Sequence, residues 1–151
     1  MPRAWPALAA VVALAALAAA TPASASRFIR SGVFDDGLIL YGDPATVSPL
    51  LKSAKTETVR VNLWWGGRPV AVAGRKPVNA ADPADPAYDW ATYDRTVRWA
   101  RAMGIQVLFS IIGTPWWANG GKGWNVVPTR AQDLQGFATA AAARYNGTYK
   151  L

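Results

Sequence analysis

The sequence contains no cysteine and no histidine. Without cysteine no disulfide can brace the chain, and without histidine the commonest metal ligand and the Ser-His and Cys-His nucleophile pairs are excluded. Glutamate is almost absent too, because Glu57 is the only one in the chain. Chemistry by these residues would have to use carboxylates, and we expect neither a metal nor an organic cofactor.

The chain also lacks a hydrophobic run long enough to cross a bilayer, which takes about 20 residues. Its longest apolar block, 7–20, follows Arg3 and precedes Ala23-Ser24-Ala25, the small-x-small pattern of signal-peptidase cleavage. We therefore predict a cleaved signal peptide at 1–25, a secreted bacterial protein with no membrane association, and one domain over 26–151.

Acidic residues are few, which leaves a net charge of +7. A basic balance can indicate nucleic-acid binding, but here the Lys and Arg residues are scattered, with no run of three and no recognisable nucleic-acid-binding motif. A solvated basic surface is the better interpretation, and we expect no nucleic-acid partner.

Three β-then-α patterns follow one another, the order that gives parallel strands joined by crossover helices. We predict strands at Leu38–Tyr41, Thr58–Trp64 and Ile105–Ile112, the last buried on both faces because it is almost wholly apolar. The fold class is therefore α/β, and a loop of about 23 residues over 66–88 is predicted to form a structured rim.

The helices carry recognisable start signals. Asp43-Pro44 or Ser48-Pro49 should begin the first helix, with Leu50, Leu51 and Ala54 facing inward. Asp89 is predicted to cap the second helix, which places Trp90, Tyr93, Val97 and Ala100 on one stripe. Thr129 and Gln132 fit a capping box for the third, whose apolar stripe includes Leu134, Phe137, Ala141 and Tyr145.

Aromatic and polar residues gather at or just beyond the predicted strand ends, where α/β folds keep their ligand sites. Strand alternation puts Arg60, Asn62 and Trp64 on one face, and we expect an acidic residue, Asp35, Asp36, Asp43 or Glu57, to face Arg60. Indole rings stack well on sugar rings, although they can equally pack under loops. The predicted substrate-binding residues are Arg60, Asn62, Trp64, Trp65, Trp116 and Trp117.

With TVRVNLWW at 58–65, YDWATYD at 88–94 and MGIQVLFSIIGTPWWANGG at 103–121, the chain resembles the N-terminal part of cellulase-like glycoside hydrolases of clan A. The resemblance implies a (β/α)8 TIM barrel, of which about the first three βα units are present, and hydrolysis of O-glycosyl bonds in a polysaccharide or oligosaccharide. Arg60 resembles the strand-two arginine of these enzymes, while Trp116 and Trp117 resemble subsite walls.

In that clan two glutamates, after the fourth and at the seventh strand, perform catalysis. Neither has a counterpart here, so no catalytic residue is predicted and the chain itself is expected to be inactive. The alternative is a non-catalytic secreted carbohydrate-binding α/β module. A nucleotide-binding doubly wound domain ranks last, because no glycine-rich phosphate loop follows the first strand.

Overall fold

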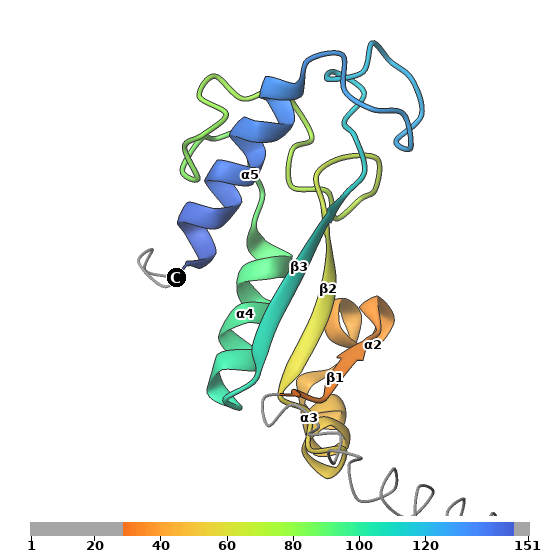
Figure 1. Cartoon of the computed structure of the whole chain (residues 1–151), viewed down its shortest axis with the longest axis vertical. Coiled ribbons are helices and arrows are strands. Elements are labelled where there is room, and N and C mark those ends of the chain that lie inside the picture. Colours follow the sequence, from red (N-terminus) through yellow and green to blue (C-terminus); the bar gives the residue numbers. More distant parts are fainter. Residues whose placement is uncertain (1–28, 147–151) are drawn as a thin grey trace, which may run out of the picture.

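A computed structural model describes residues 29–146, and the predicted signal peptide lies outside them. The fold is α/β: a three-stranded parallel sheet, in the order β1-β2-β3, alternates with helices (Figure 1). The elements are β1 (Gly32–Phe34), α2 (Asp36–Tyr41), α3 (Pro44–Ser53), β2 (Thr58–Trp64), α4 (Ala91–Ala102), β3 (Gln106–Ile112) and α5 (Ala131–Tyr145). No helix within this part of the chain is long and apolar enough to span a membrane.

The central strand β2 has the predicted bounds, because its sequence alternates clearly between apolar and polar residues. Val59, Val61 and Leu63 are fully buried beneath the helices. Arg60, Asn62 and Trp64 share the opposite face, which we call the inner face, and are exposed or half-buried. In register with them, Phe34 of β1 and Leu108 of β3 flank Arg60.

The first strand was predicted in the wrong place. Leu38–Tyr41 is the end of helix α2, and the strand that pairs with β2 is Gly32–Phe34. Asp35 explains the difference, since its carboxylate accepts a hydrogen bond from Leu38 N at 3.0 Å and so caps a helix there. A four-residue apolar run is too short for periodicity to distinguish a strand from a buried helical turn.

Helix α3 begins at the predicted Asp43-Pro44 signal, with Asp43 accepting from Ala45 N at 3.1 Å. The hydrogen bonds lower the pKa of Asp43, that from Ala45 N most strongly. Its inward residues were predicted only in part. Leu51 is buried as predicted, but Leu50 and Ala54 are exposed. Val47 is the other buried residue of the helix.

Helix α4 buries its predicted stripe, Trp90, Tyr93, Val97 and Ala100. Its cap position is Trp90 rather than the predicted Asp89, although the Asp89 carboxylate accepts from Ala91 N at 2.9 Å. Other residues of α4 form hydrogen bonds with α2 and α3. Arg95 donates to the Leu40 carbonyl, and Trp99 Nε1 donates to Ser48 Oγ at 2.8 Å. Helices α2, α3 and α4 thus form one layer over the buried sheet face.

The predicted capping box at the start of α5 is wrong. Thr129 Oγ1 donates instead to the Ala118 carbonyl. Arg130 occupies the cap position and its side chain makes no capping hydrogen bond, although it pairs with Asp133 in the first turn. Packing, rather than capping, positions this helix. Phe137 is fully buried between the rings of Trp65 and Trp90, while the predicted stripe residue Leu134 is 37% exposed.

A charged pair completes the α4–α5 contact. Arg144 donates through Nε to Asp94 Oδ1 at 2.8 Å and through its terminal nitrogen to Oδ2, and the Tyr145 hydroxyl donates to Oδ1 at 3.0 Å. The side chains of Asp94 and Arg144 are only 12% and 13% exposed. Burial and this carboxylate raise the pKa of Tyr145.

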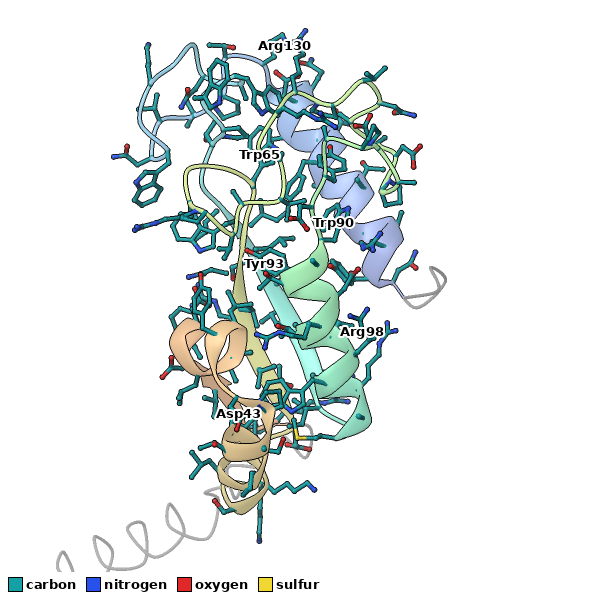
Figure 2. All side chains as sticks on the ribbon, turned by 180° about the vertical axis from the view of Figure 1, so that it is seen from behind. Asp43, Trp65, Trp90, Tyr93, Arg98 and Arg130 are labelled. Atoms are coloured by element: carbon teal, nitrogen blue, oxygen red, sulfur yellow. The ribbon has the colours of Figure 1, made fainter. Side chains whose placement is uncertain are left out.

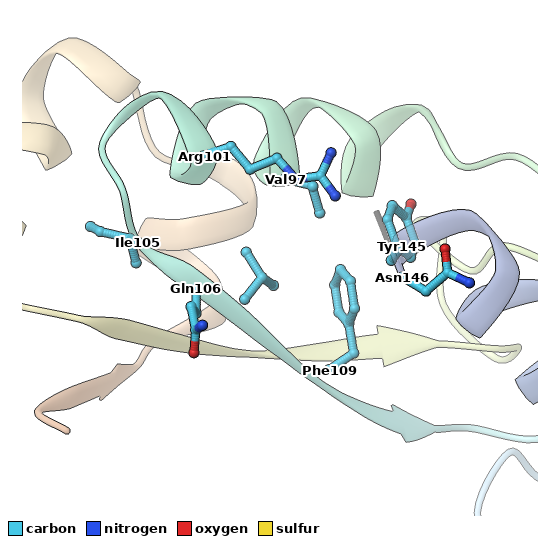
Figure 3. Close-up of a pocket in the computed structure, with 8 residues that line it drawn as sticks. Val97, Arg101, Ile105, Gln106, Phe109, Tyr145 and Asn146 are labelled. Atoms are coloured by element: carbon cyan, nitrogen blue, oxygen red, sulfur yellow. The ribbon is translucent and has the colours of Figure 1, made fainter. Parts of the chain in front are cut away.

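Strand β3 was predicted to be buried on both faces, and this is wrong for the described chain. Leu108 on the inner face is 56% exposed and Ile111 on the other face 37%. A pocket of about 290 Å³ lies between α4 and β3, bounded by Arg101, Phe109 and Tyr145 (Figure 3). The reason is geometric, since only one edge of β3 is paired among residues 29–146 and α5 meets it mainly through Tyr145.

Candidate carbohydrate-binding site

The loops gather beyond the carboxyl ends of β2 and β3 (Figure 1), and two glycines bring the ends of these loops close together. Gly113 follows β3 at φ +75°, and a Cβ there would lie 2.3 Å from the Gly66 carbonyl oxygen. Gly67 has φ +81°, and its Cβ would lie 2.2 Å from that of Trp124. Neither position accepts a side chain, and this close approach places Trp124 beside the end of β2.

The Trp64 and Trp124 rings meet edge to face, with centroids 5.3 Å apart and planes at 70°. The Arg68 guanidinium lies over both, with its carbon 5.1 Å from the Trp64 ring centre and 5.8 Å from that of Trp124. A pocket of about 380 Å³ opens beside this group, and it is lined by Asp36, Tyr41, Trp64, Arg68, Pro69 and Val70. We call these residues, together with Trp124, the aromatic pocket.

Two polar residues of the pocket, Asp36 and Tyr41, come from helix α2. Asp36 opens α2, and its Oδ1 accepts from the backbone N–H of Asn62 at 3.0 Å, which ties this carboxylate to the edge of β2 just beyond the end of β1. Tyr41 closes the same helix and is 58% exposed. The pocket therefore combines apolar ring faces with one carboxylate and one guanidinium, which is the mixture that a polyhydroxylated ring requires.

Arg60 lies further down the inner face, away from the strand ends. Its Nε donates to Ser110 Oγ at 2.8 Å, and its guanidinium carbon lies 4.4 Å from the centre of the Phe34 ring. None of the four expected acidic residues pairs with Arg60 among the described residues. Asp35 and Asp43 cap helices, Asp36 accepts from Asn62 N, and Glu57 accepts from Ser31 N. Arg60 is exposed, so water solvates its charge and no buried carboxylate is needed.

The other predicted tryptophans do not join the aromatic pocket. Trp65 is 2% exposed and lies within the core (Figure 2). Alternation along the chain turns its side chain to the side opposite that of Trp64. Trp117 meets Trp65 edge to face at 5.7 Å and donates through Nε1 to the Ala73 carbonyl at 3.1 Å. Trp116 is 67% exposed on the loop after β3. Trp65 and Trp117 therefore pack beneath the loops, and of these three tryptophans only Trp116 is exposed to solvent.

Two short-range networks hold the loops that carry the pocket. Asp85 accepts from Asn79 N, Ala87 N and Val78 N, and these hydrogen bonds, led by that from Asn79, lower the pKa of its carboxyl group. Asn119 is buried, donates to the Gly123 carbonyl at 2.9 Å and accepts from Lys122 N at 3.0 Å. The long loop 66–88 is thus structured, and the turn before Trp124 is ordered.

Sequence reasoning missed Asp36, Tyr41 and Arg68 as pocket residues and left Trp124 out of the predicted set. The misplaced first strand hid Asp36 and Tyr41, which α2 brings into the same pocket as Trp64. Arg68 follows Trp64-Trp65-Gly66-Gly67, and the double glycine is the one local signal that the loop turns back on the strand end.

Comparisons with models of known protein families, with curated proteins and with solved structures found no match to this chain.

Proposed function

We propose that this protein binds carbohydrate at the aromatic pocket and that its fold is the first part of a (β/α)8 barrel of the glycoside hydrolase type. The observation that carries the proposal is the grouping of Trp64, Trp124, Arg68 and Asp36 at the carboxyl ends of parallel strands. This is the edge of the sheet at which barrel enzymes bind their substrates.

The chemistry of the pocket suits a sugar ring. The rings of Trp64 and Trp124 offer apolar area for the C–H groups of the ring, and their contacts with each other and with Arg68 orient them before a ligand arrives. Asp36 and Arg68 supply an acceptor and a donor for hydroxyl groups. The predicted ligand class, a polysaccharide or oligosaccharide, is therefore retained.

The function of these 151 residues is proposed to be binding rather than hydrolysis. Glycoside hydrolysis requires two carboxyl groups about 5–10 Å apart across the scissile bond. Among the pocket residues Asp36 is the only acid, and Glu57 belongs to the opposite, amino-terminal end of β2, where Gln106 N donates to its carbonyl. This favours the non-catalytic module for the chain as it stands.

Binding can be measured by titrating the purified protein with soluble oligosaccharides and following tryptophan fluorescence and heat. We expect Trp64→Ala to weaken binding at least about tenfold, as for other aromatic anchors. Val127→Ala, an exposed residue of the loop that also carries Trp124, is the matched control and should change nothing. No release of reducing sugar is expected.

The close approach of the loops gives an independent test. Gly67→Ala puts a methyl group against Trp124 and should separate the two indoles, so the exciton signal of the Trp64–Trp124 pair in circular dichroism should be lost together with binding. The proposal fails if no saccharide binds, or if binding survives both Trp64→Ala and Gly67→Ala.

A further inference from the structure

Arg68 is the least satisfied charged group of the aromatic pocket. Its guanidinium lies over the rings of Trp64 and Trp124 and lines the pocket, but among residues 29–146 it takes part in neither ion pair, since these are Arg130–Asp133 and Arg144–Asp94. The side chain also donates no hydrogen bond within that part of the structure. A cation is therefore oriented by two rings with its donors unused.

The stacking determines which part of the guanidinium is available. Cation–π contacts engage its flat face, whereas its five N–H groups lie in its plane and form a fork that matches a carboxylate or sulfate. Stacking on indole also reduces the rotamer freedom that a long side chain would otherwise lose on binding. Arg68 is thus prepared for a planar or tetrahedral anion.

The charges around the pocket agree with this assignment. Asp36 lines the same pocket, but its Oδ1 already accepts from Asn62 N and it forms no ion pair with Arg68. Arg60 adds a second cation on the same inner face, without an acidic partner among the described residues. The guanidinium groups of Arg68 and Arg60 therefore outnumber the Asp36 carboxylate at the pocket and on the inner face below it.

We propose that the carbohydrate bound at the aromatic pocket is acidic, and that Arg68 selects it by pairing with the carboxylate or sulfate group of one sugar unit. This inference rests on the proposed carbohydrate-binding function and adds the ligand class. Trp64 and Trp124 then recognise the ring, and Arg68 recognises its charge.

The test compares three soluble ligands on the purified protein by calorimetry: an oligogalacturonate, a sulfated oligosaccharide and a neutral cello-oligosaccharide of similar length. We expect one of the acidic ligands to bind at least about tenfold more tightly than the neutral one, and which of them does so identifies the anionic group. Added salt should reduce this preference, because the pocket is open to solvent.

Arg68→Gln should abolish the preference for the acidic over the neutral ligand, whereas Arg68→Lys should keep part of this preference, since it retains the charge but loses the fork. Arg98→Gln is the matched control, because Arg98 points outward from α4, away from the pocket (Figure 2).

If neutral and acidic ligands bind equally, or if Arg68→Gln leaves the preference intact, the inference is overturned while carbohydrate binding stands. If no ligand binds at all, the proposed function itself fails, and the two failures are thus distinguished.

Discussion

The rings of Trp90 and Phe137 lie stacked, with centroids 5.6 Å apart and 4° between their planes. Trp90 sits at the start of α4 and Phe137 in the middle of α5, so this one contact joins the two helices. Trp65 stacks on Phe137 as well, at 5.8 Å and 20°. The Phe137 ring therefore connects the helices to the loop that follows β2.

Phe137→Ala should remove this connection and leave a cavity in the core, because Phe137 is fully buried. We expect a loss of about 3–5 kcal/mol in the free energy of unfolding, measured by urea denaturation. Leu134→Ala, on the same helix but 37% exposed, should cost about 1 kcal/mol or less. Equal effects of the two substitutions would contradict the packing described for α5.

Arg144→Met tests the buried charge pair. Of the Asp94 carboxylate's partners within residues 29–146, it leaves only the Tyr145 hydroxyl, in a site where the Asp94 side chain is 12% exposed. We expect a loss of about 3–5 kcal/mol in the free energy of unfolding. Arg130→Met breaks the other ion pair, Arg130–Asp133, in which the arginine side chain is 58% exposed, and should cost less than about 1 kcal/mol. Thermal unfolding of both variants gives the comparison, and a ranking in the reverse order would refute it.

The sequence predicted the fold best where a local pattern was long and unambiguous. The alternation of Val59, Val61 and Leu63 with polar residues gave β2 its observed bounds, and the stripe of α4 is buried as predicted. The prediction of a strand at Leu38–Tyr41 failed because so short an apolar run shows no periodicity. The helix cap at Asp35 determines the conformation of this segment. The prediction that β3 is buried on both faces failed because the burial of a strand depends on the elements that cover it, and the strand's own residues do not encode these elements.

Of the residues that form the aromatic pocket, only Trp64, which lies in a strand, could be predicted from the sequence. Trp64 follows from alternation in β2, and the same alternation sends the adjacent Trp65 into the core. Arg68 and Trp124 are 56 residues apart in sequence and meet only because Gly67 and Gly113 let two loops approach each other. Such contacts depend on backbone conformations of loops, which hydrophobic periodicity does not report.

Alkaline pH should destabilise the protein through one buried and two half-buried tyrosines. Burial raises the pKa of Tyr88, Tyr93 and Tyr145 above the usual value. Above about pH 10 the unfolded chain releases phenolic protons that the folded chain retains, so the free energy of unfolding falls as pH rises. The stabilisation is complete below about pH 10 and is lost progressively towards the raised pKa values.

The measurement is the urea midpoint between about pH 9 and pH 12, together with the ultraviolet absorbance of phenolate. Tyr93 is fully buried and should contribute a slope of about 1.4 kcal/mol per pH unit at most. Tyr93→Phe removes the hydroxyl that accepts from Trp64 N, so it should lower stability at pH 7 and flatten the alkaline slope. A midpoint that stays constant across this range would show that these phenols titrate alike in both states.

The open edge of β3 predicts self-association. Its seven residues, Gln106–Ile112, include no charged side chain, and neither proline nor lysine protects the edge that is unpaired within the described chain. Strands of this kind pair with other chains, so the purified protein should form dimers and larger species as its concentration rises. Light scattering after size-exclusion chromatography measures this directly.

Leu108→Glu should suppress the association without harming the fold. Leu108 is 56% exposed and is in register with Arg60 of the parallel strand β2, so a carboxylate there has a cationic neighbour while it places a charge on the edge strand. Val78→Glu introduces the same charge at a fully exposed loop position away from β3 and should leave association unchanged. If the unsubstituted protein is a monodisperse monomer with one sharp unfolding transition, or if Val78→Glu suppresses association equally well, then the β3 edge is not what joins the molecules.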